Sequence, residues 1–376
     1  MMKLVNEFDN YVPKIVDESL AKATLIKSVE MKNRIKRVTE YTTMGRRPVQ
    51  GEFMLFAYES FNNTKHISDE IIHQLKALLL ALEMMQSYAI IWDDYDDESK
   101  LRFGKTCWHL VDDNNTLALL DGCIMRSFTE EIARQNTKGK HREQVLKILS
   151  GTYFTGSVGQ HMDTVVQRSK NYDNFTIEQY NLINTYKSAI YSVKTPILMA
   201  LALSNKLNRK SFEIVDDVCT DIGTMVQIHN DLLNYFDTKG MTEGKTGTDI
   251  QEGKCSWVAV TVLRHCTPGQ RRIFIDNYGS WDPEKFSRIL QLYESMDLVK
   301  LYKQEEESRF NTFFKKINDL PKDATPSSDF FQRFHKLLCK YTQNISGYMY
   351  DKHLKLKSSR MFVLNLIAHE QTNPDP

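Results

Sequence analysis

The sequence predicts an all-α protein that forms one large helical domain. Glycine and proline number only 16 and 9 among the 376 residues, so the chain has few places to turn and long helices are expected. No segment alternates strictly between apolar and polar residues and ends in an Asn-Gly or Asp-Gly turn, which is the usual signature of a β-hairpin. We see no internal repeat, so we expect residues 1–376 to form a single domain.

The first long helix is expected to begin after Ser68, a good N-cap residue. Asp69 and Glu70 follow it at the positive end of the helix dipole. Apolar residues then recur with a helical period through residues 71–91, on enough sides to bury most of the helix. Charged and polar residues interrupt this run, so we expect no stable membrane insertion.

Two further long helices are expected. Thr176 and Gln179 fit a capping box that opens a helix towards Leu203, which Pro196 interrupts and kinks. Helical periodicity also covers residues 212–236. Surface connections are expected near residues 135–142, 240–247 and 320–328, and an amphipathic stretch near residues 330–338.

Basic and acidic side chains nearly cancel, because Lys and Arg number 49, Asp and Glu number 48, and the formal net charge is +1. A general nucleic-acid binder or a polybasic membrane binder needs excess positive charge, so neither class is expected. The N-terminus lacks the basic and apolar regions of a secretory signal. The six cysteines are scattered without a CxxC pair, which is typical of reduced thiols in a cytoplasmic protein.

The first long helix ends in an acidic cluster, Asp-Asp-Tyr-Asp-Asp, at residues 93–97. Asp93 and Asp97 are four residues apart and share a helix face, with Asp94 beside them. Carboxylates crowded at the negative end of a helix dipole destabilise the helix unless cations neutralise them. Oxygen ligands suit Mg²⁺, which commonly bridges protein carboxylates to phosphate oxygens. The alternative is a solvated acidic helix end.

A second cluster, Asn-Asp-Leu-Leu-Asn at residues 230–234, repeats this spacing in the third long helix. Amide oxygens bind Mg²⁺ without charge, so this site is expected to be weaker, and the alternative is a polar, partly exposed helix face. Acids that hold Mg²⁺, together with separate cationic donors, suit a diphosphate. The candidate donors are Arg102, Lys187, Lys245 and Lys254.

Several further motifs occur with these two in a fixed order. They are Gln86, Arg102-Phe103-Gly104, Cys107-Trp108, Gly159-Gln160 with Asp163, Tyr186-Lys187-Ser188, Gln227, and residues 247–250 and 253–257. Through them, over roughly residues 40–270, the chain resembles the trans-isoprenyl diphosphate synthases, the farnesyl diphosphate synthase family. The resemblance implies a single bundle of long helices around a central apolar cavity, usually assembled as a homodimer. Residues from about 271 to 376 would then be helical scaffold.

Two departures from the family concern the second substrate, isopentenyl diphosphate. A typical Gly-Gly-Lys-x-x-Arg-Gly segment reads Gly-Arg-Arg-Pro-Val-Gln-Gly at residues 45–51, with Gln50 in place of the last arginine. A typical Arg-Arg-Gly reads Arg-Phe-Gly, with Phe103 in place of the second arginine. Each charge-assisted hydrogen bond is worth about 1.5–3 kcal/mol, so losing two would weaken binding roughly 10²–10⁴-fold. The resemblance thus implies a degenerate isopentenyl diphosphate site at Arg47, Gln50 and Phe103.

The second cluster also departs from the Asp-Asp-x-x-Asp of the synthases. It is closer to the (Asn/Asp)-Asp-x-x-(Ser/Thr)-x3-Glu motif of class I terpene cyclases, although Asn234 and Thr238 do not match that motif. The combination resembles the insect terpene synthases derived from the farnesyl synthase branch. We therefore expect a Mg²⁺-dependent terpene synthase, a carbon–oxygen lyase. It would ionise a prenyl diphosphate, farnesyl diphosphate above others, and release diphosphate to give a sesquiterpene hydrocarbon or alcohol.

The resemblance assigns a role to each candidate site residue. The residues expected to act in catalysis are Asp93, Asp94, Asp97, Arg102, Lys187 and Asn230. The expected ligands of about three Mg²⁺ ions are Asp93, Asp97, Asn230 and Asn234. Diphosphate binding is assigned to Arg102, Lys187, Lys245 and Lys254, and support of these groups to Asp94, Asp163, Asp231 and Asp249. The substrate pocket is assigned to Gln86, Tyr88, Ala89, Trp92, Phe103, Tyr191 and Gln227, with the small Ala89 enlarging its floor.

Two other functions stay open. One is a prenyl diphosphate synthase that condenses isopentenyl diphosphate with an allylic diphosphate despite Gln50 and Phe103. The other is a catalytically silent partner subunit, which has no need of a destabilising acidic cluster. The sequence does not distinguish a C10 from a C15 substrate, its double-bond isomer or the product skeleton.

Overall fold

The computed structural model describes residues 1–62, 67–237 and 247–349, and it confirms the all-α class. The first half contains α1 (Met2–Asn6), α2 (Phe8–Lys22), α3 (Val29–Thr43), α4 (Val49–Phe61), α5 (Asp69–Asp96), η1 (Trp108–Asp113), α6 (Leu117–Asn136) and α7 (Gly139–Ser169). The second half contains η2 (Tyr172–Asn174), α8 (Ile177–Asn184), η3 (Thr185–Lys194), α9 (Thr195–Leu203), α10 (Arg209–Asp237), α11 (Asp249–Glu252), α12 (Trp257–His265), α13 (Pro268–Asn277), α14 (Pro283–Glu294), α15 (Leu298–Asn318) and α16 (Ser328–Met349). The strands are two residues each, β1 (Leu101–Arg102) and β2 (Lys105–Thr106), paired as a small antiparallel hairpin.

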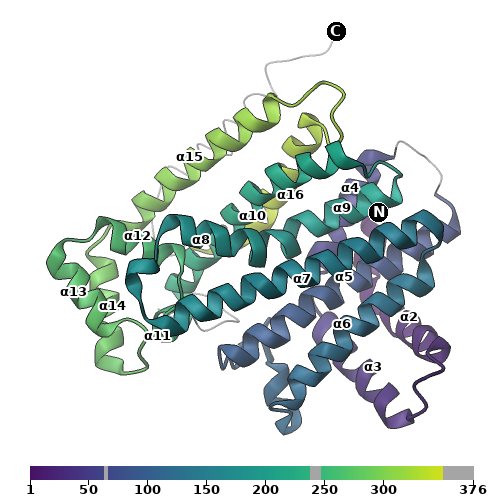
Figure 1. The fold of residues 1–376 in the computed structure, drawn as a ribbon, viewed down its shortest axis with the longest axis horizontal. Helices are drawn as coiled ribbons and strands as arrows, with labels where there is room; N and C mark the ends of the chain where they lie inside the picture. The colour runs from purple at the N-terminus through teal and green to yellow at the C-terminus, as the bar shows by residue number, and fades with distance from the viewer. Residues whose placement is uncertain (63–66, 238–246, 350–376) are drawn as a thin grey trace.

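The long helices are arranged along one axis of the molecule (Figure 1). Helices α2 and α3 lie at one end and α12, α13 and α14 at the opposite end, with α7 running between the two. The expected connection at residues 320–328 is present, but most of residues 135–142 is helical, because α6 ends at Asn136 and α7 already begins at Gly139. Most of the loop expected at 240–247 lies outside the described residues.

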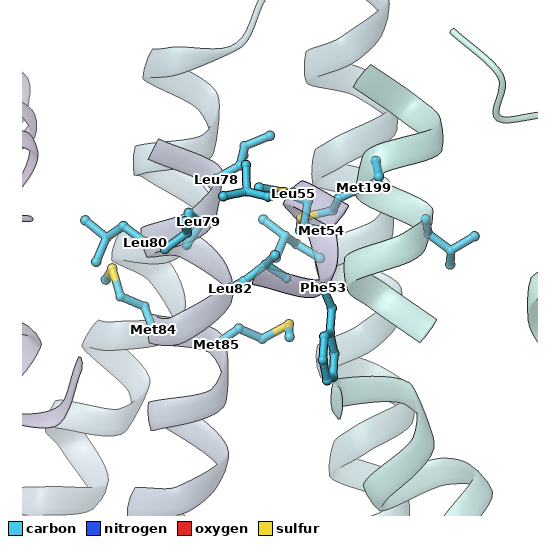
Figure 2. Packing of buried hydrophobic residues seen from close by; sticks show 14 of the residues in the cluster. Phe53, Met54, Leu55, Leu78, Leu79, Leu80, Leu82, Met84, Met85 and Met199 are labelled. Atoms are coloured by element: carbon cyan, nitrogen blue, oxygen red, sulfur yellow. The ribbon is translucent and has the colours of Figure 1, made fainter. Parts of the chain in front are cut away.

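Helix α5 is the core helix of the bundle and begins as predicted. The Ser68 hydroxyl accepts a hydrogen bond from the backbone N–H of Ile71. Figure 2 shows leucine and methionine side chains of α5 packed beside Phe53, Met54 and Leu55 of α4 and Met199 of α9. This helix is long and apolar enough to cross a membrane, but 67% of its apolar window is buried inside the protein, as expected of a core helix.

The helix predicted towards Leu203 is interrupted by a π-helix. Thr176 caps its start by accepting from the backbone N–H of Gln179. Regular α-helix ends at Asn184, η3 is a π-helix, and α9 resumes one residue before Pro196. Proline lacks an N–H and crowds the carbonyl four residues earlier, so an α-helix is difficult to sustain through it. The sequence predicts a kink at Pro196, but the structure has a π-helix before it instead. Segments of π-helix are often found at functional sites.

Two glycines hold η3 against its neighbours. A Cβ atom on Gly159 of α7 would lie 2.4 Å from the backbone nitrogen of Lys187, and one on Gly223 of α10 would lie 2.4 Å from Cα of Ala189. Contacts this short leave no space for a side chain, so α7 and α10 approach the backbone of η3 directly. This close packing fixes the position from which Lys187 extends.

Candidate active site

The acidic cluster lies where α5 ends, and two of its four carboxylates serve structural partners. The carboxylate of Asp94 accepts from Nε of Arg102 at 2.7 Å, which ties the β1–β2 hairpin to α5. Asp96 accepts from Arg168 at 2.5 Å and from Thr164 at 2.8 Å, both on α7. Asp93 and Asp97, which lie four residues apart on α5, pair instead with two lysines, and their metal role stays a prediction.

Lysines from two distant segments reach these carboxylates. Nζ of Lys187 lies 3.0 Å from Oδ1 of Asp93 and 2.6 Å from Oδ2 of Asp163 on α7. Nζ of Lys254 lies 2.7 Å from Oδ2 of Asp97, 3.9 Å from Asp93 and 3.8 Å from Asp163. Residues from α5, α7, η3 and the segment after α11 therefore form one charged network. It contains Asp93, Asp97 and Lys187, which are half of the residues predicted for catalysis.

The network sets the pKa values of its three carboxyl groups. Burial raises the pKa of Asp93 and Asp163, but the nearby ammonium groups of Lys187 and Lys254 outweigh this and lower both pKa values below the ordinary range. Asp97 differs, since burial raises its pKa to about 7 against the attraction of Lys254, and repulsion from Asp93 adds to the rise. Asp93 and Asp163 are therefore held as carboxylates, and Asp97 ionises near neutrality.

The donor atoms at the end of α5 fit Mg²⁺. Carboxylate oxygens are the ligands this ion prefers, and Oδ1 of Asp97 is buried without a hydrogen-bond partner among the described residues. Within the same residues, no three acidic, histidine or cysteine side chains already converge as a metal site. The lysines occupy part of the carboxylate surface, so Mg²⁺ binding there requires Lys187 and Lys254 to turn away from Asp93 and Asp97.

The second cluster divides into an exposed and a buried half. Asn230 is exposed on α10, whereas Asn234 is 4% exposed and its side-chain oxygen accepts from the backbone N–H of Asp249. The i,i+4 spacing therefore does not make the two amides equivalent. Asn230 is the one open to a ligand, and the metal role of Asn234 stays a prediction. Lys245 lies outside the described residues.

Asp231 supports the second cluster from inside. Its carboxylate accepts from the hydroxyl of Tyr180, the side-chain amide of Gln227 and the backbone N–H of Trp257, at 2.7–2.8 Å. The oxygen of Gln227 in turn accepts from Ser188 of η3 at 2.8 Å. The supporting role predicted for Asp231 agrees with these contacts, and Gln227, predicted to line the pocket, links η3 to α10.

Aromatic side chains extend from the charged network along α5. The ring of Tyr88 meets Tyr153 of α7 edge-on at 5.1 Å and lies 6.5 Å from Trp92. Trp92 packs against α6, where a Cβ on Gly122 would lie 2.8 Å from its Nε1. The ring of Tyr191 covers Gly156 in the same way. Tyr88, Trp92 and Tyr191 thus lie among large apolar groups beside the acidic cluster, and Ala89 packs at the edge of the main core.

The segment expected to bind the second diphosphate contains a cation that the motif comparison missed. Gln50 is buried and donates to Oε1 of Gln86 at 3.2 Å. Phe103 is 56% exposed, and the guanidinium carbon of Arg46 lies 4.9 Å from the centre of its ring. Arg47 pairs with Glu52 at 2.7 Å. The available signal was the Arg46-Arg47 pair itself, since the family pattern has glycine at the first of these positions.

Comparisons with known proteins place these motifs in one family. The model of the family described as Polyprenyl synthetase matches residues 32–296. The farnesyl pyrophosphate synthase of Rattus norvegicus is 30% identical over 78% of this chain and 84% of its own length. That of Zea mays is 29% identical over 78% of this chain and 85% of its own. That of Murgantia histrionica is 26% identical over 82% of this chain and 76% of its own.

Solved structures share the fold. The farnesyl diphosphate synthase of T. brucei, determined in complex with a bisphosphonate, superposes with a TM-score of 0.78 at 24% sequence identity, covering 93% of this chain and 98% of that one. This likeness establishes the helical architecture of the isoprenoid synthases for the present chain, as the sequence predicted.

The expectation of a terpene synthase, and with it of a lyase, is wrong. The relatives named above are farnesyl pyrophosphate synthases, enzymes that make a prenyl diphosphate. Gln50 and Phe103 stand where the family has cations. The structure adds a cation that this comparison of positions omits, because the guanidinium of Arg46 lies against the face of Phe103.

Proposed function

The chain belongs to the polyprenyl synthetase family, and we propose that it is a prenyl diphosphate synthase that makes farnesyl diphosphate. In this proposal it condenses isopentenyl diphosphate with an allylic diphosphate. The observation that carries the proposal is the network in which Lys187 and Lys254 meet Asp93, Asp97 and Asp163. Such a network provides both the carboxylates and the cationic donors that a departing diphosphate needs.

The chain's own residues position and stabilise the diphosphate of the allylic substrate. Lys187, Lys254 and Arg102 exchange their carboxylate partners for diphosphate oxygens, whose negative charge grows as the allylic C–O bond breaks. The double bond of isopentenyl diphosphate then attacks the allylic carbon, a C–C bond forms, and a proton leaves the new unit. The aromatic side chains along α5 hold the hydrocarbon chain and exclude water.

Asp93 and Asp97 would hold Mg²⁺ in this reaction. When bound, Mg²⁺ neutralises the diphosphate and supports its departure. Asp163 keeps Lys187 in place through an ion pair, and Asp94 does the same for Arg102. Both carboxylates therefore orient cations.

A homodimer is part of the proposal, because α6 and α7 carry an exposed apolar face. Phe154 and Val165 of α7 are 73% and 51% exposed. Leu117 and Leu120 of α6 are 51% and 59% exposed. A second copy of this chain, related by a twofold axis, would cover the same face on both subunits. Light scattering after gel filtration is expected to give the dimer mass, with Phe154→Glu shifting it to the monomer. A monomeric wild-type protein would refute this part.

The activity is tested by giving the purified protein isopentenyl diphosphate with dimethylallyl or geranyl diphosphate and Mg²⁺. The expected product is a longer prenyl diphosphate, identified by mass spectrometry, with Asp93→Ala as the inactive control. Hydrocarbon or alcohol formed from farnesyl diphosphate alone, without elongation, would contradict the proposal. No turnover with any of these substrates would instead favour a silent subunit.

A further inference from the structure

Arg46 is held on three sides between α3, α5 and the β1–β2 turn. Its Nη1 forms an ion pair with Glu83 at 2.9 Å, and its Nε donates to the carbonyl oxygen of Thr42 at 3.2 Å. The ring of Phe103 covers one face of the guanidinium at 4.9 Å. Its Nη2 is buried and has no hydrogen-bond partner among the described residues. The Nη2 edge of this fixed guanidinium therefore has N–H donors available for a hydrogen-bond acceptor of a ligand.

Glu83 explains why a cation is required at this place. Its side chain is fully buried on α5 and also accepts from the backbone N–H of Gly51 at 3.2 Å. Burial raises the pKa of Glu83, and the guanidinium of Arg46 opposes that rise. Gln50, which stands where the family has arginine, is neutral and bonds to Gln86. The cation that pairs with Glu83 is therefore Arg46.

Phe103 adopts an unfavourable backbone conformation in order to lie beside Arg46. Its φ is 52°, in the left-handed region that large side chains avoid, and Gly104 follows with a φ of 72°. Two consecutive residues with positive φ give the tight turn that joins short antiparallel strands. At this position the ring of Phe103 meets the guanidinium of Arg46, and a cation over an aromatic face is attracted by the ring.

We propose that Arg46 is a binding residue for the diphosphate of isopentenyl diphosphate, replacing the cations absent at positions 50 and 103, and that Phe103 positions it. This inference rests on the proposed synthase function. The Nη2 edge of Arg46 donates to the diphosphate while Nη1 stays on Glu83. Substrate specificity at this site then depends on a residue outside the family's usual positions.

Steady-state kinetics with each substrate varied in turn test the inference. Arg46→Gln is expected to raise KM for isopentenyl diphosphate roughly 10- to 100-fold, with KM for the allylic diphosphate unchanged. Arg37→Gln is the matched control, because Arg37 also pairs with an acid, Asp112, and lies over an aromatic ring, Trp108, away from the site. An unchanged KM in Arg46→Gln would overturn the inference while leaving the synthase function intact.

Three further variants separate binding from folding. Arg46→Gln leaves Glu83 buried without its ion-pair partner, so the double variant Arg46→Gln/Glu83→Gln is expected to recover the melting temperature but not KM. Recovery of both would show a purely structural role and overturn the inference. Phe103→Leu is expected to raise the same KM several-fold, with Phe103→Tyr restoring it. If the wild-type protein neither elongates nor binds isopentenyl diphosphate in calorimetry, the synthase proposal itself fails.

Discussion

Nζ of Lys254 lies 2.7 Å from Oδ2 of Asp97, so a lysine 157 residues further along the chain neutralises the carboxylate that caps α5. The approach depends on Gly253, whose φ of 76° lets the backbone reverse after α11. The same ammonium group lies 3.9 Å from Asp93 and 3.8 Å from Asp163. Lysine and carboxylates therefore share one small volume, and a diphosphate with Mg²⁺ would enter by separating them.

The acidic cluster predicts different outcomes for neighbouring carboxylates. Asp97→Asn is expected to lower kcat by at least ~10²-fold, because it removes a ligand charge beside the departing diphosphate. Asp96→Asn should keep activity within roughly threefold, since Asp96 bonds to Arg168 and Thr164 at a partly exposed position. Initial rates with Mg²⁺ titrated for each variant provide the measurement. Equal losses in both variants would show that the cluster acts only through its total charge.

Packing around η3 predicts that Gly159 is essential. In Gly159→Ala the new Cβ would lie 2.4 Å from the backbone of Lys187, so η3 must shift, at about 1–3 kcal/mol and with a fall in kcat. Gly151→Ala on the same helix is the control, because its Cβ meets nothing within 4 Å among the described residues. It is expected to stabilise α7 by about 0.5–1 kcal/mol. Urea unfolding and kcat of both variants check this, and a neutral Gly159→Ala would contradict the close packing.

In the second cluster, we expect substitution of one residue, Asp231, to lower stability and substitution of its neighbour, Asn230, to lower activity alone. Asp231→Ala leaves three donors without their acceptor, from Tyr180, Gln227 and Trp257, and is expected to cost roughly 3 kcal/mol or more. Asn230→Ala changes an exposed side chain, so stability should be preserved while activity falls. Thermal melts beside rate measurements separate the two. An active Asn230→Ala would remove this residue from the metal-binding set.

Local signals in the sequence were enough to predict much of this structure. The Ser68 cap and the apolar run predicted α5, and the spacing of Asp93 and Asp97 predicted that they share a helix face, where each pairs with a lysine. These features depend on neighbours within one or two helical turns. The family motifs named each member of the charged network as a site residue, which stays a prediction, but sequence spacing alone could not bring Asp163 and Lys254 together.

What the sequence could not reveal depends on distant contacts. The π-helix differs from an α-helix by one residue per hydrogen bond, and it packs against Gly159 and Gly223, which belong to other helices. Asn234 matched the metal spacing, but its oxygen bonds to a backbone N–H 15 residues away. The cation near Phe103 came from Arg46, 57 positions earlier, so comparing motifs position by position counted a charge as missing.

Two buried histidines predict how acid affects stability. His335 of α16 is 3% exposed and its ring lies against Phe310 and Phe313, and burial lowers its pKa to about 4. The pKa of His229 on α10 is lowered to about 4 by burial as well. In the unfolded chain each histidine is protonated below about pH 6.5, whereas in the folded protein it stays neutral down to about pH 4. Each histidine therefore lowers the free energy of unfolding as the pH falls through this window.

His335→Gln should reduce that acid sensitivity. Its free energy of unfolding, measured by urea denaturation, is expected to be lower than wild type near neutral pH because ring packing is lost. The difference from wild type should shrink by about 2 kcal/mol near pH 5, since one pKa unit corresponds to about 1.4 kcal/mol.

The comparison uses the difference between variant and wild type because other groups also titrate in this range. The pKa values of Asp97 and Asp231 are raised to about 7 and 6, so these groups stabilise the fold as the pH falls, equally in both proteins. Groups facing His335, the Cys339 thiol and Glu306 across an 80 Å³ cavity, are also common to both. A difference that stays constant from about pH 7 to about pH 5 would show that His335 is protonated in the folded protein, and the burial argument would fail.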